Sequence, residues 1–210
     1  MEQIILNNYQ LYTLNKLIKH DNCFLFWPRQ TGKTTLMSFY IGNYVKNNYG
    51  QNIIFIVNDK KRIRDSNYKI VRDLYDSKVI TKNYNNSLFF INDNILKFIK
   101  IDNIINNPTG LFNNSLIIYD EFYYHEKLIN LVHHLKYVEK YKSIFTSTDM
   151  NIDIIKKIDF KNNYYININT KYQKFPEFDY KENQLMDFND LSYQRKSKIK
   201  LLNKISIENF

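Results

Sequence analysis

Residues 24–36, FLFWPRQTGKTTL, contain a Gly-Lys-Thr triplet of the kind that binds phosphate. Gly32 carries no Cβ, so backbone N–H groups can close around a phosphate at this point. Lys33 would reach the β- and γ-phosphates of a nucleotide, and the Thr34 hydroxyl would bind Mg²⁺. A standard phosphate loop begins with an additional glycine, whereas this sequence has Trp-Pro-Arg at 27–29.

The flanking residues place this triplet between a strand and a helix. The continuous apolar run CFLFW, residues 23–27, is typical of a strand buried on both faces. Helical spacing begins at Thr34 and continues to about residue 49, where Gly50 would end the helix. Such a helix directs the positive end of its dipole at the phosphate. A chance Gly-Lys-Thr at a helix start is the alternative, and the strand–loop–helix context disfavours it.

A second cluster, Asp120 and Glu121, offers the two carboxylates that nucleotide hydrolysis needs. The apolar run before the pair predicts a buried strand over 115–119 that ends at Asp120. We expect Asp120 to hold the Mg²⁺ shell and Glu121 to orient and deprotonate the attacking water. Asp120 could instead only cap the following helix, but capping requires neither the apolar run nor a phosphate loop upstream.

The remaining periodicities predict an α/β fold with a mostly parallel sheet. Helical spacing occurs at 9–20, 59–76 and 124–140, and strand-like apolar runs occur at 52–57, 115–122, 143–148 and 163–168. Two β-rich runs around 92–94 predict a hairpin. Alternating strands and helices imply helices on both faces, with ligands at the carboxyl ends of the strands. The sequence therefore predicts a three-layer P-loop NTPase of the RecA/ASCE-like class.

Composition and charge limit the binding partners and the cellular compartment that we expect. The chain has 210 residues, 44% of them apolar, and a formal net charge of +9. This charge suits a polyanion such as nucleic acid, although Lys is one of several abundant residues with A/T-rich codons, so codon drift explains it equally well. The single cysteine, Cys23, permits no disulfide framework and fits a reducing compartment. No apolar run approaches about 20 residues, so we expect a soluble protein without a membrane span.

These motifs together resemble the ATPase domain of viral large terminase subunits, which pump DNA into capsids. That family has a variant Walker A, Arg-Gln-x-Gly-Lys-Ser/Thr, without the first glycine, and residues 29–34 fill it. LIIYDEF resembles its Walker B with the catalytic glutamate, FTSTD its coupling motif, and NNYQLYTLNKL its adenine-side motif. The resemblance covers roughly residues 9–170.

The resemblance implies a role for each motif residue. Arg29 would act as a cis arginine finger, a group that raises the rate of nucleotide hydrolysis by about 10³–10⁵-fold. The alternative is that Arg29 pairs with a structural acid at the loop rim. Gln10 would read the adenine edge, or it is an ordinary solvated residue at a helix start. Thr146, Ser147 and Thr148 would sense the γ-phosphate, a role compatible with capping the next helix. The predicted nucleotide-binding residues are Tyr9, Gln10, Gln30, Thr31, Gly32, Lys33, Thr34 and Thr35.

The resemblance also implies an activity and its partners. We expect a DNA-dependent ATPase that uses ATP and Mg²⁺ and translocates double-stranded DNA as a homo-oligomeric ring on a viral portal or procapsid, in the interior of the host cell. A DExx-type helicase shares these motifs, but it needs a second RecA-like domain that 210 residues cannot hold. A nucleotide-dependent switch with a degenerate site is a third interpretation, which the intact Lys33, Asp120 and Glu121 disfavour.

The domain division is predicted at residue 170. Residues 1–170 would form the ATPase domain, and the polar segment 171–210 a partly helical appendage. We expect no nuclease activity, because the acids of this segment have no buried strands to carry them, and a nuclease or a small terminase could be a separate chain. DNA phosphates could contact two basic stretches, or both could be solvated helix faces. Their residues are Lys60, Lys61, Arg62 and Arg64 in the first, and Arg195, Lys196, Lys198 and Lys200 in the second.

Overall fold

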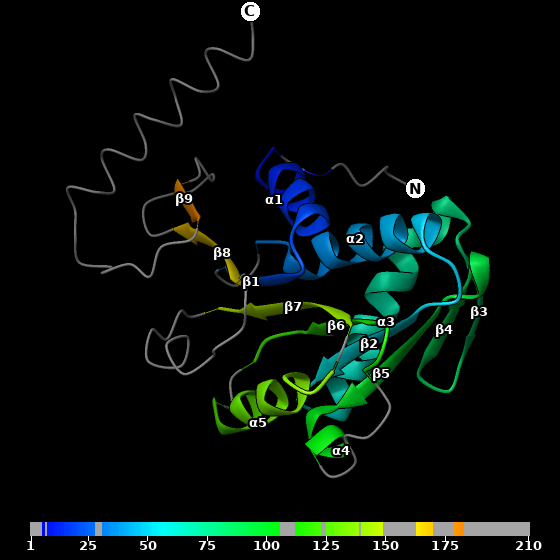
Figure 1. The fold of residues 1–210 in the computed structure, drawn as a ribbon. Helices are drawn as coiled ribbons and strands as arrows, with labels where there is room; N and C mark the ends of the chain where they lie inside the picture. The colour runs from blue at the N-terminus through cyan, green and yellow to red at the C-terminus, as the bar shows by residue number, and fades with distance from the viewer. Residues whose placement is uncertain are drawn as a thin grey trace, which may run out of the picture.

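The structure is a computed structural model that describes residues 6, 8–27, 31–105, 112–122, 125–138, 140–148, 163–169 and 179–182. The described residues form a nine-stranded sheet with helices on both faces (Figure 1). The strands are β1 Asn22–Phe26, β2 Asn52–Val57, β3 Ile80–Tyr84, β4 Ser87–Phe90, β5 Ile95–Lys100, β6 Ser115–Tyr119, β7 Tyr141–Ser147, β8 Asn163–Asn169 and β9 Asp179–Glu182. The helices are α1 Asn8–Lys19, α2 Lys33–Asn47, α3 Lys60–Leu74, α4 Ile101–Ile105 and α5 His125–Leu135, with 3-10 turns at Tyr75–Ser77 and Ile91–Asp93.

The sheet order brings the predicted site motifs to one edge. The order is β3-β4-β5-β2-β6-β7-β1-β8-β9, and the strands from β5 to β8 in this order run parallel. Strand β7 lies between β1 and β6, with Phe26 opposite Ser147 and Tyr119 opposite Phe145. The carboxyl ends of these three strands therefore meet; β1 and β6 are each followed by a motif, and β7 ends within the third, at Thr146 and Ser147. The α/β fold with a mostly parallel sheet is confirmed.

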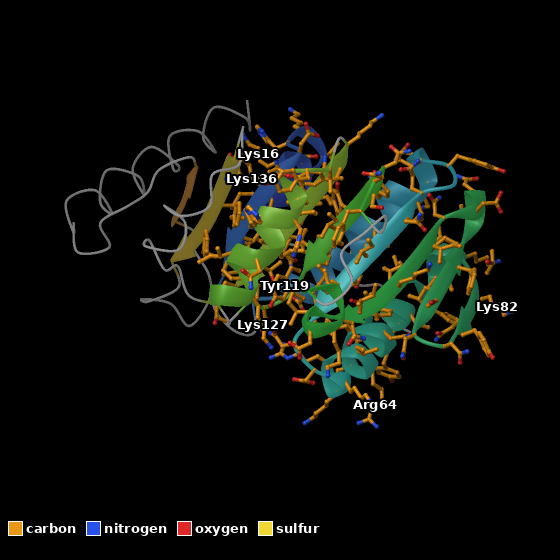
Figure 2. All side chains as sticks on the ribbon, turned by 60° about the horizontal axis from the view of Figure 1, so that its bottom comes forward. Lys16, Arg64, Lys82, Tyr119, Lys127 and Lys136 are labelled. Atoms are coloured by element: carbon orange, nitrogen blue, oxygen red, sulfur yellow. The ribbon has the colours of Figure 1, made fainter. Side chains whose placement is uncertain are left out.

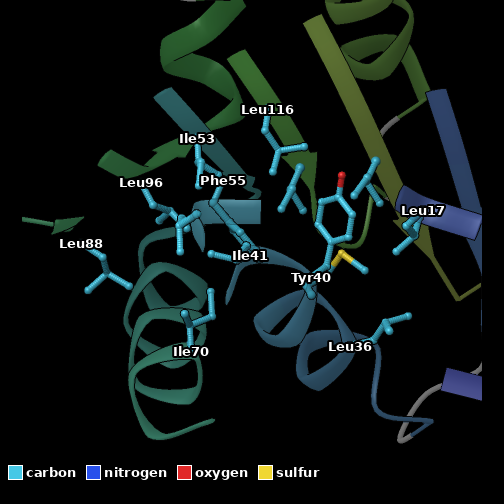
Figure 3. Close-up of a cluster of buried hydrophobic side chains, with 14 of the residues drawn as sticks. Leu17, Leu36, Tyr40, Ile41, Ile53, Phe55, Ile70, Leu88, Leu96 and Leu116 are labelled. Atoms are coloured by element: carbon cyan, nitrogen blue, oxygen red, sulfur yellow. The ribbon is translucent and has the colours of Figure 1, made fainter. Parts of the chain in front are cut away.

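Two apolar clusters hold the three layers together. Along β1 the side chains alternate, so Leu25 packs toward α1, α2 and α3 while Phe24 packs toward α4 and α5. Figure 3 shows the first cluster, in which Ile41 of α2 and Ile70 of α3 meet the sheet side chain Phe55. On the other face, Phe24 and Phe145 stack with ring centroids 4.8 Å apart. Burial on both faces explains why β1, β2 and β6 read as continuous apolar runs.

Two helices end earlier than their periodicity predicts. Helix α2 ends at Asn47, before Gly50, and α5 ends at Leu135. Gly50 has a φ of 63° but lies beyond the end of α2. The side chain of Asn94 explains the earlier end of α2, because its Nδ2 donates to the carbonyls of Val45 (3.1 Å) and Asn48 (2.8 Å). These carbonyls are among those that a helix end leaves without intrahelical donors.

Replacing Asn94 with leucine is expected to lower the free energy of unfolding by about 2–3 kcal/mol, since the Asn48 carbonyl loses this donor and the Gln51 N–H loses its acceptor. Asn94 is fully buried, and its Oδ1 also accepts from the backbone N–H of Gln51 at 3.0 Å. Asn47→Leu is the control, because this exposed amide bonds to Asn43 within α2 itself. Urea unfolding of both variants measures the difference. An equal loss in the two would show that Asn94 does not anchor the end of α2.

The predicted hairpin is confirmed, and a neighbouring strand was missed. Strands β4 and β5 pair antiparallel around the turn at Ile91–Asp93. Strand β3 pairs antiparallel with β4, and the linking residues Asn85 and Asn86 have φ values of 46° and 57°. Positive φ at both central residues is the geometry of a tight hairpin turn, and Asn tolerates it better than most residues.

The sheet continues beyond residue 170. Strand β9 pairs antiparallel with β8, so residues 179–182 of the predicted appendage belong to the sheet. The rest of 171–210, with its expected helix and basic stretch, lies outside the described residues. The domain division therefore stays a prediction. Among the described residues, every helix is too short or too polar to cross a membrane.

Candidate active site

The start of α2 is built to receive an anion. Gly32 is its N-cap residue, with φ 82° and ψ 25°, in the left-handed region that favours glycine. Within the described residues, no side chain caps the helix, and the first intrahelical bond runs from the Leu36 N–H to the Gly32 carbonyl at 2.9 Å. The N–H groups of residues 33–35 therefore have no intrahelical acceptor and can donate to a phosphate. Arg29 and Gln30 lie outside the described residues, so their roles stay predictions.

Lys33 lies beneath this loop, and Thr34 lies at its rim. Lys33 is buried, and its Nζ donates to the carbonyl of Trp27 at 2.7 Å. Trp27 directly follows β1, so the ammonium spans the loop from its helix side to its strand side. Thr34 is half-buried and lines a cleft, and Thr35 is half-buried in the same helical turn. A triphosphate that enters the loop can take the Lys33 ammonium from the Trp27 carbonyl, because the phosphate carries a full negative charge and the carbonyl does not.

Gln10 packs against the loop from α1. Gln10 is 6% exposed, so it is not a solvated residue at the helix start. Its Nε2 makes a long contact of 3.5 Å to the Thr31 carbonyl, and a Cβ placed on Gly32 would lie 2.4 Å from the same atom. Gln10 thus helps to fix the loop backbone, whether or not it also contacts a base. The side chain of Tyr9 lies outside the described residues.

Asp120 is buried at the end of β6. Its Oδ1 accepts a hydrogen bond of 2.8 Å from the Thr146 hydroxyl, which β7 supplies. Burial raises the pKa of the Asp120 carboxyl above its ordinary value, and the Thr146 hydrogen bond and the nearby charges of Arg62 and Lys33 oppose this shift. A buried carboxylate has lost its hydration water. A divalent cation bound to its oxygen would replace that hydration and stabilise the charged form.

Glu121 is held in a strained backbone conformation. Its φ of 52° lies in the left-handed region, which costs a non-glycine residue on the order of 1 kcal/mol. Two neighbours hold it there: Asn58 Nδ2 donates to the Glu121 carbonyl at 2.6 Å, and the Glu121 N–H donates to Thr146 Oγ1 at 3.0 Å. Asp120 lines the cleft beside Thr34, and Glu121 is not among the described residues that line it, so a site that both acids face stays a prediction. The Glu121 carboxylate forms an ion pair with the guanidinium of Arg62 from α3.

The two predicted motifs open into one cleft of about 410 Å³. Thr34, from the start of α2, and Asp120, from the end of β6, both line it. The other lining residues are Asp59, Lys61, Arg62, Asp65, Ser66 and Lys69. A hydroxyl and a carboxylate oxygen at one cleft fit the oxygen donors that Mg²⁺ prefers. The structure therefore brings the start of the phosphate-loop helix and Asp120 together. Ser147 is buried and Thr148 is half-buried at the end of β7.

Replacing Thr146 with valine is expected to lower the free energy of unfolding by about 2–4 kcal/mol, because one hydroxyl serves both the buried Asp120 carboxylate and the backbone N–H of Glu121. Valine keeps the shape of the fully buried side chain, but it removes the donor to Asp120 and the acceptor for the Glu121 N–H. The matched control is Thr81→Val on β3, whose hydroxyl bonds the Phe89 carbonyl at an exposed position. Denaturant unfolding should show a change within about 0.5 kcal/mol for the control. A similarly small change for Thr146→Val would mean that the hydroxyl does not link the acids.

Two residues of this site escaped the sequence analysis. Asn58 follows β2, and its Oδ1 also accepts from the Tyr119 hydroxyl at 2.9 Å. A polar residue directly after a buried parallel strand is the signal that could have found it. Arg62 was expected only as a DNA contact, and its partner Glu121 depends on how α3 packs, which local spacing does not reveal.

The fold and this site define the class of P-loop NTPases, as predicted. Residues 3–157 match the model of the family described as type III restriction enzyme, res subunit, and the chain belongs to this family. No curated protein matches the sequence. The chain is thus a member of the P-loop ATPase superfamily to which helicases and terminases belong.

Solved structures of terminases and a helicase share the fold. The large terminase of a thermophilic bacteriophage has a TM-score of 0.61 at 15% identity, covering 78% of this chain and 46% of that one. The same terminase in complex with ATP-gamma-S has a TM-score of 0.57 at 15% identity, covering 78% of this chain and 44% of that one. The Hef helicase domain of Pyrococcus furiosus gives 0.55 at 15% identity, covering 77% and 38%. The chain spans less than half the length of these proteins, and the predicted terminase resemblance is confirmed at the level of the fold.

Proposed function

We propose that this chain hydrolyses ATP as a motor subunit of a terminase-like machine that moves double-stranded DNA into a viral capsid. The observation that carries the proposal is the single cleft that Thr34 and Asp120 both line. Binding of a triphosphate and activation of water require these two elements to face the same ligand. The likeness to the thermophilic-phage terminase in complex with ATP-gamma-S supports a nucleotide at this position.

Each site residue then has one task. The N–H groups at the start of α2 hold the phosphates, and Lys33 exchanges the Trp27 carbonyl for the β- and γ-phosphates. Thr34 and Asp120 would hold Mg²⁺, which neutralises charge on the phosphate oxygens. Glu121 orients the attacking water and accepts its proton. We propose that Arg29 neutralises charge on the γ-phosphate and that Gln10, beside Tyr9, reads the adenine edge.

Thr146 is suited to report the state of the nucleotide. Its hydroxyl contacts Asp120 and the backbone of Glu121, so a shift of either acid reaches β7 directly. Ser147 and Thr148 continue this strand end toward residues outside the described ones. We propose that this connection transmits the conformational change on hydrolysis to the elements that grip DNA. We further propose that the chain works as a homo-oligomeric ring on a portal or procapsid. A nuclease or a small terminase would be a separate chain.

A helicase or translocase is the second candidate. Membership of the restriction-enzyme subunit family and the likeness to the Hef helicase domain favour it. Its site would use the same residues for hydrolysis, so the two candidates differ in what the motor does to DNA.

ATP turnover with and without duplex DNA, followed by a forked-duplex assay, tests the proposal. A packaging motor is expected to hydrolyse ATP faster with blunt duplex and to leave the forked strands paired. Separation of the forked strands would favour the helicase. Binding of ATP without turnover in either condition would contradict both and indicate a nucleotide-dependent switch.

A further inference from the structure

Three strands at one end of the sheet, β3, β4 and β5, present a face that the described helices leave uncovered. The pairing of β4 with its two neighbours places six side chains on this face, in two rows that cross the strands. The intervening side chains Leu88 and Leu96 point the other way, into the apolar cluster to which α3 contributes. We use the name hairpin face for the six side chains of the two rows, which are Lys82, Phe89 and Ile95, and Tyr84, Ser87 and Lys97.

A β-bulge turns the side chains of β3 toward the hairpin face. The pairing shifts between Ile80, which lies opposite Phe90 and packs against the core, and Lys82, which lies opposite Phe89. In a regular strand, residues two apart point to the same face, so Lys82 would follow Ile80 toward the core. The extra residue, Thr81, reverses this direction. Bulges re-aim side chains in this way, and here the bulge presents a lysine on the uncovered face.

Lysine and aromatic side chains are interleaved on the hairpin face. The Lys82 ammonium lies 5.3 Å from the ring centroid of Tyr84 and 5.8 Å from that of Phe89. Tyr84 is 58% exposed, and Phe89 is half-buried yet belongs to neither apolar cluster of the described residues. Figure 2 shows Lys82 at the rim of the sheet. Both rings therefore stay accessible to a ligand that approaches from solvent.

The charge of this region favours an anionic ligand. Residues 80–100 contain three lysines and a single acid, Asp93. Asp93 lies in the turn between β4 and β5, where its carboxylate accepts a hydrogen bond from the Tyr49 hydroxyl at 2.6 Å. The hairpin face itself carries no carboxylate. A polyanion would gain from the lysines, and the aromatic rings would gain as well if that polyanion also exposed flat apolar groups.

We propose that the hairpin face binds single-stranded nucleic acid, with bases stacked on its aromatic rings and phosphates held by its lysines. A single strand exposes both base rings and phosphates, and aromatic side chains beside cations are the combination that binds them. In a duplex the bases stack on one another, so a duplex would engage the lysines alone. This inference goes beyond the proposed motor function, which concerns double-stranded DNA, and it does not depend on ATP hydrolysis.

Replacing Tyr84 with alanine is expected to weaken binding of a labelled oligothymidylate of about 20 nucleotides by about 5- to 150-fold, because one base loses its stacking partner. Tyr84→Phe keeps the ring and should bind as the wild type does. Lys82→Gln should reduce the slope of the logarithm of affinity against the logarithm of salt concentration by about 0.7, the share of one phosphate contact in a single strand.

Fluorescence anisotropy without ATP measures the affinity of the full chain and of each variant for this oligothymidylate, for an oligouridylate of the same length and for a blunt duplex. The matched controls are Tyr137→Ala and Lys46→Gln, which change an exposed tyrosine and an exposed lysine outside the hairpin face and should bind as the wild type does. Thermal unfolding confirms that each variant is folded. Binding of either single strand that falls as expected in Tyr84→Ala supports the inference and identifies DNA or RNA as the ligand.

Two results would overturn the inference and leave the ATPase function untouched. Wild-type binding of single strands by both Tyr84→Ala and Lys82→Gln would show that the bulge and its lysine only protect an edge strand from aggregation. An equal loss of duplex and single-strand binding in Tyr84→Ala would show that no base stacks on the ring. Absence of ATP turnover together with Tyr84-dependent binding would overturn the proposed function alone.

Discussion

Replacing Glu121 with glutamine is expected to lower the kcat for ATP hydrolysis by about 10²–10⁴-fold, the usual contribution of a positioned general base. Glutamine keeps the size of the side chain and the hydrogen bonds that Asn58 and Thr146 make to the Glu121 backbone. It cannot accept a proton from water. Because the phosphate-binding elements are untouched, ATP affinity should stay within about threefold of the wild type. Steady-state turnover and binding of a fluorescent ATP analogue measure the two effects separately.

The control for this variant is Asp76→Asn, the same chemical change at an exposed residue in the turn after α3. It should leave turnover and affinity unchanged. Loss of the ion pair with Arg62 should lower the stability of Glu121→Gln by less than about 1 kcal/mol, since the pair is partly exposed. A variant that is folded and still turns over ATP at the wild-type rate would show that another group activates the water.

Replacing Lys33 with methionine is expected to weaken ATP binding by about 10- to 100-fold, because a hydrogen bond to a charged group is worth about 1.5–3 kcal/mol. Turnover should fall further, since the charge on the γ-phosphate increases in the transition state. Methionine keeps the aliphatic stem that is buried beneath the loop. It removes only the ammonium that now contacts the Trp27 carbonyl.

Lys46→Met is the matched control for the lysine. Lys46 is exposed in the last turn of the same helix, α2, at the end remote from the loop. Calorimetric titration of ATP with Mg²⁺ should give wild-type affinity for this variant. If Lys33→Met also bound ATP normally, the start of α2 would not be the phosphate site.

The central strands were predictable because their environment leaves a direct mark on the sequence. β1, β2 and β6 are buried on both faces, so each is a continuous apolar run. β3 has four exposed residues among its five, and the sequence of β9, DYKE, is polar. These two outer strands are held by pairing with β4 and β8, and such non-local pairing leaves no apolar pattern to read.

The same distinction between local and non-local features separates the parts of the site that could be predicted from those that could not. The Gly-Lys-Thr triplet and the Asp-Glu pair could be predicted because each is a short motif directly after a buried strand. The contacts between motifs could not. The Thr146 hydroxyl bridges Asp120 and Glu121 only because β7 is the neighbour of β6 in the sheet. Arg62 reaches Glu121 only because α3 packs beside the cleft. In the sequence, Arg62 is one cation among several on a helix face.

Calorimetric titration of ATP, with Mg²⁺ and with EDTA, into the wild type and Asp120→Asn tests most directly whether the phosphate loop and the acid pair share one ligand. Asparagine keeps an oxygen for the Thr146 hydroxyl but removes the charge that would hold the ion. The wild type should bind ATP about tenfold or more tightly with Mg²⁺, and the gain should vanish in Asp120→Asn. If the variant keeps the full gain from Mg²⁺, Asp120 and the phosphate loop do not meet on one nucleotide.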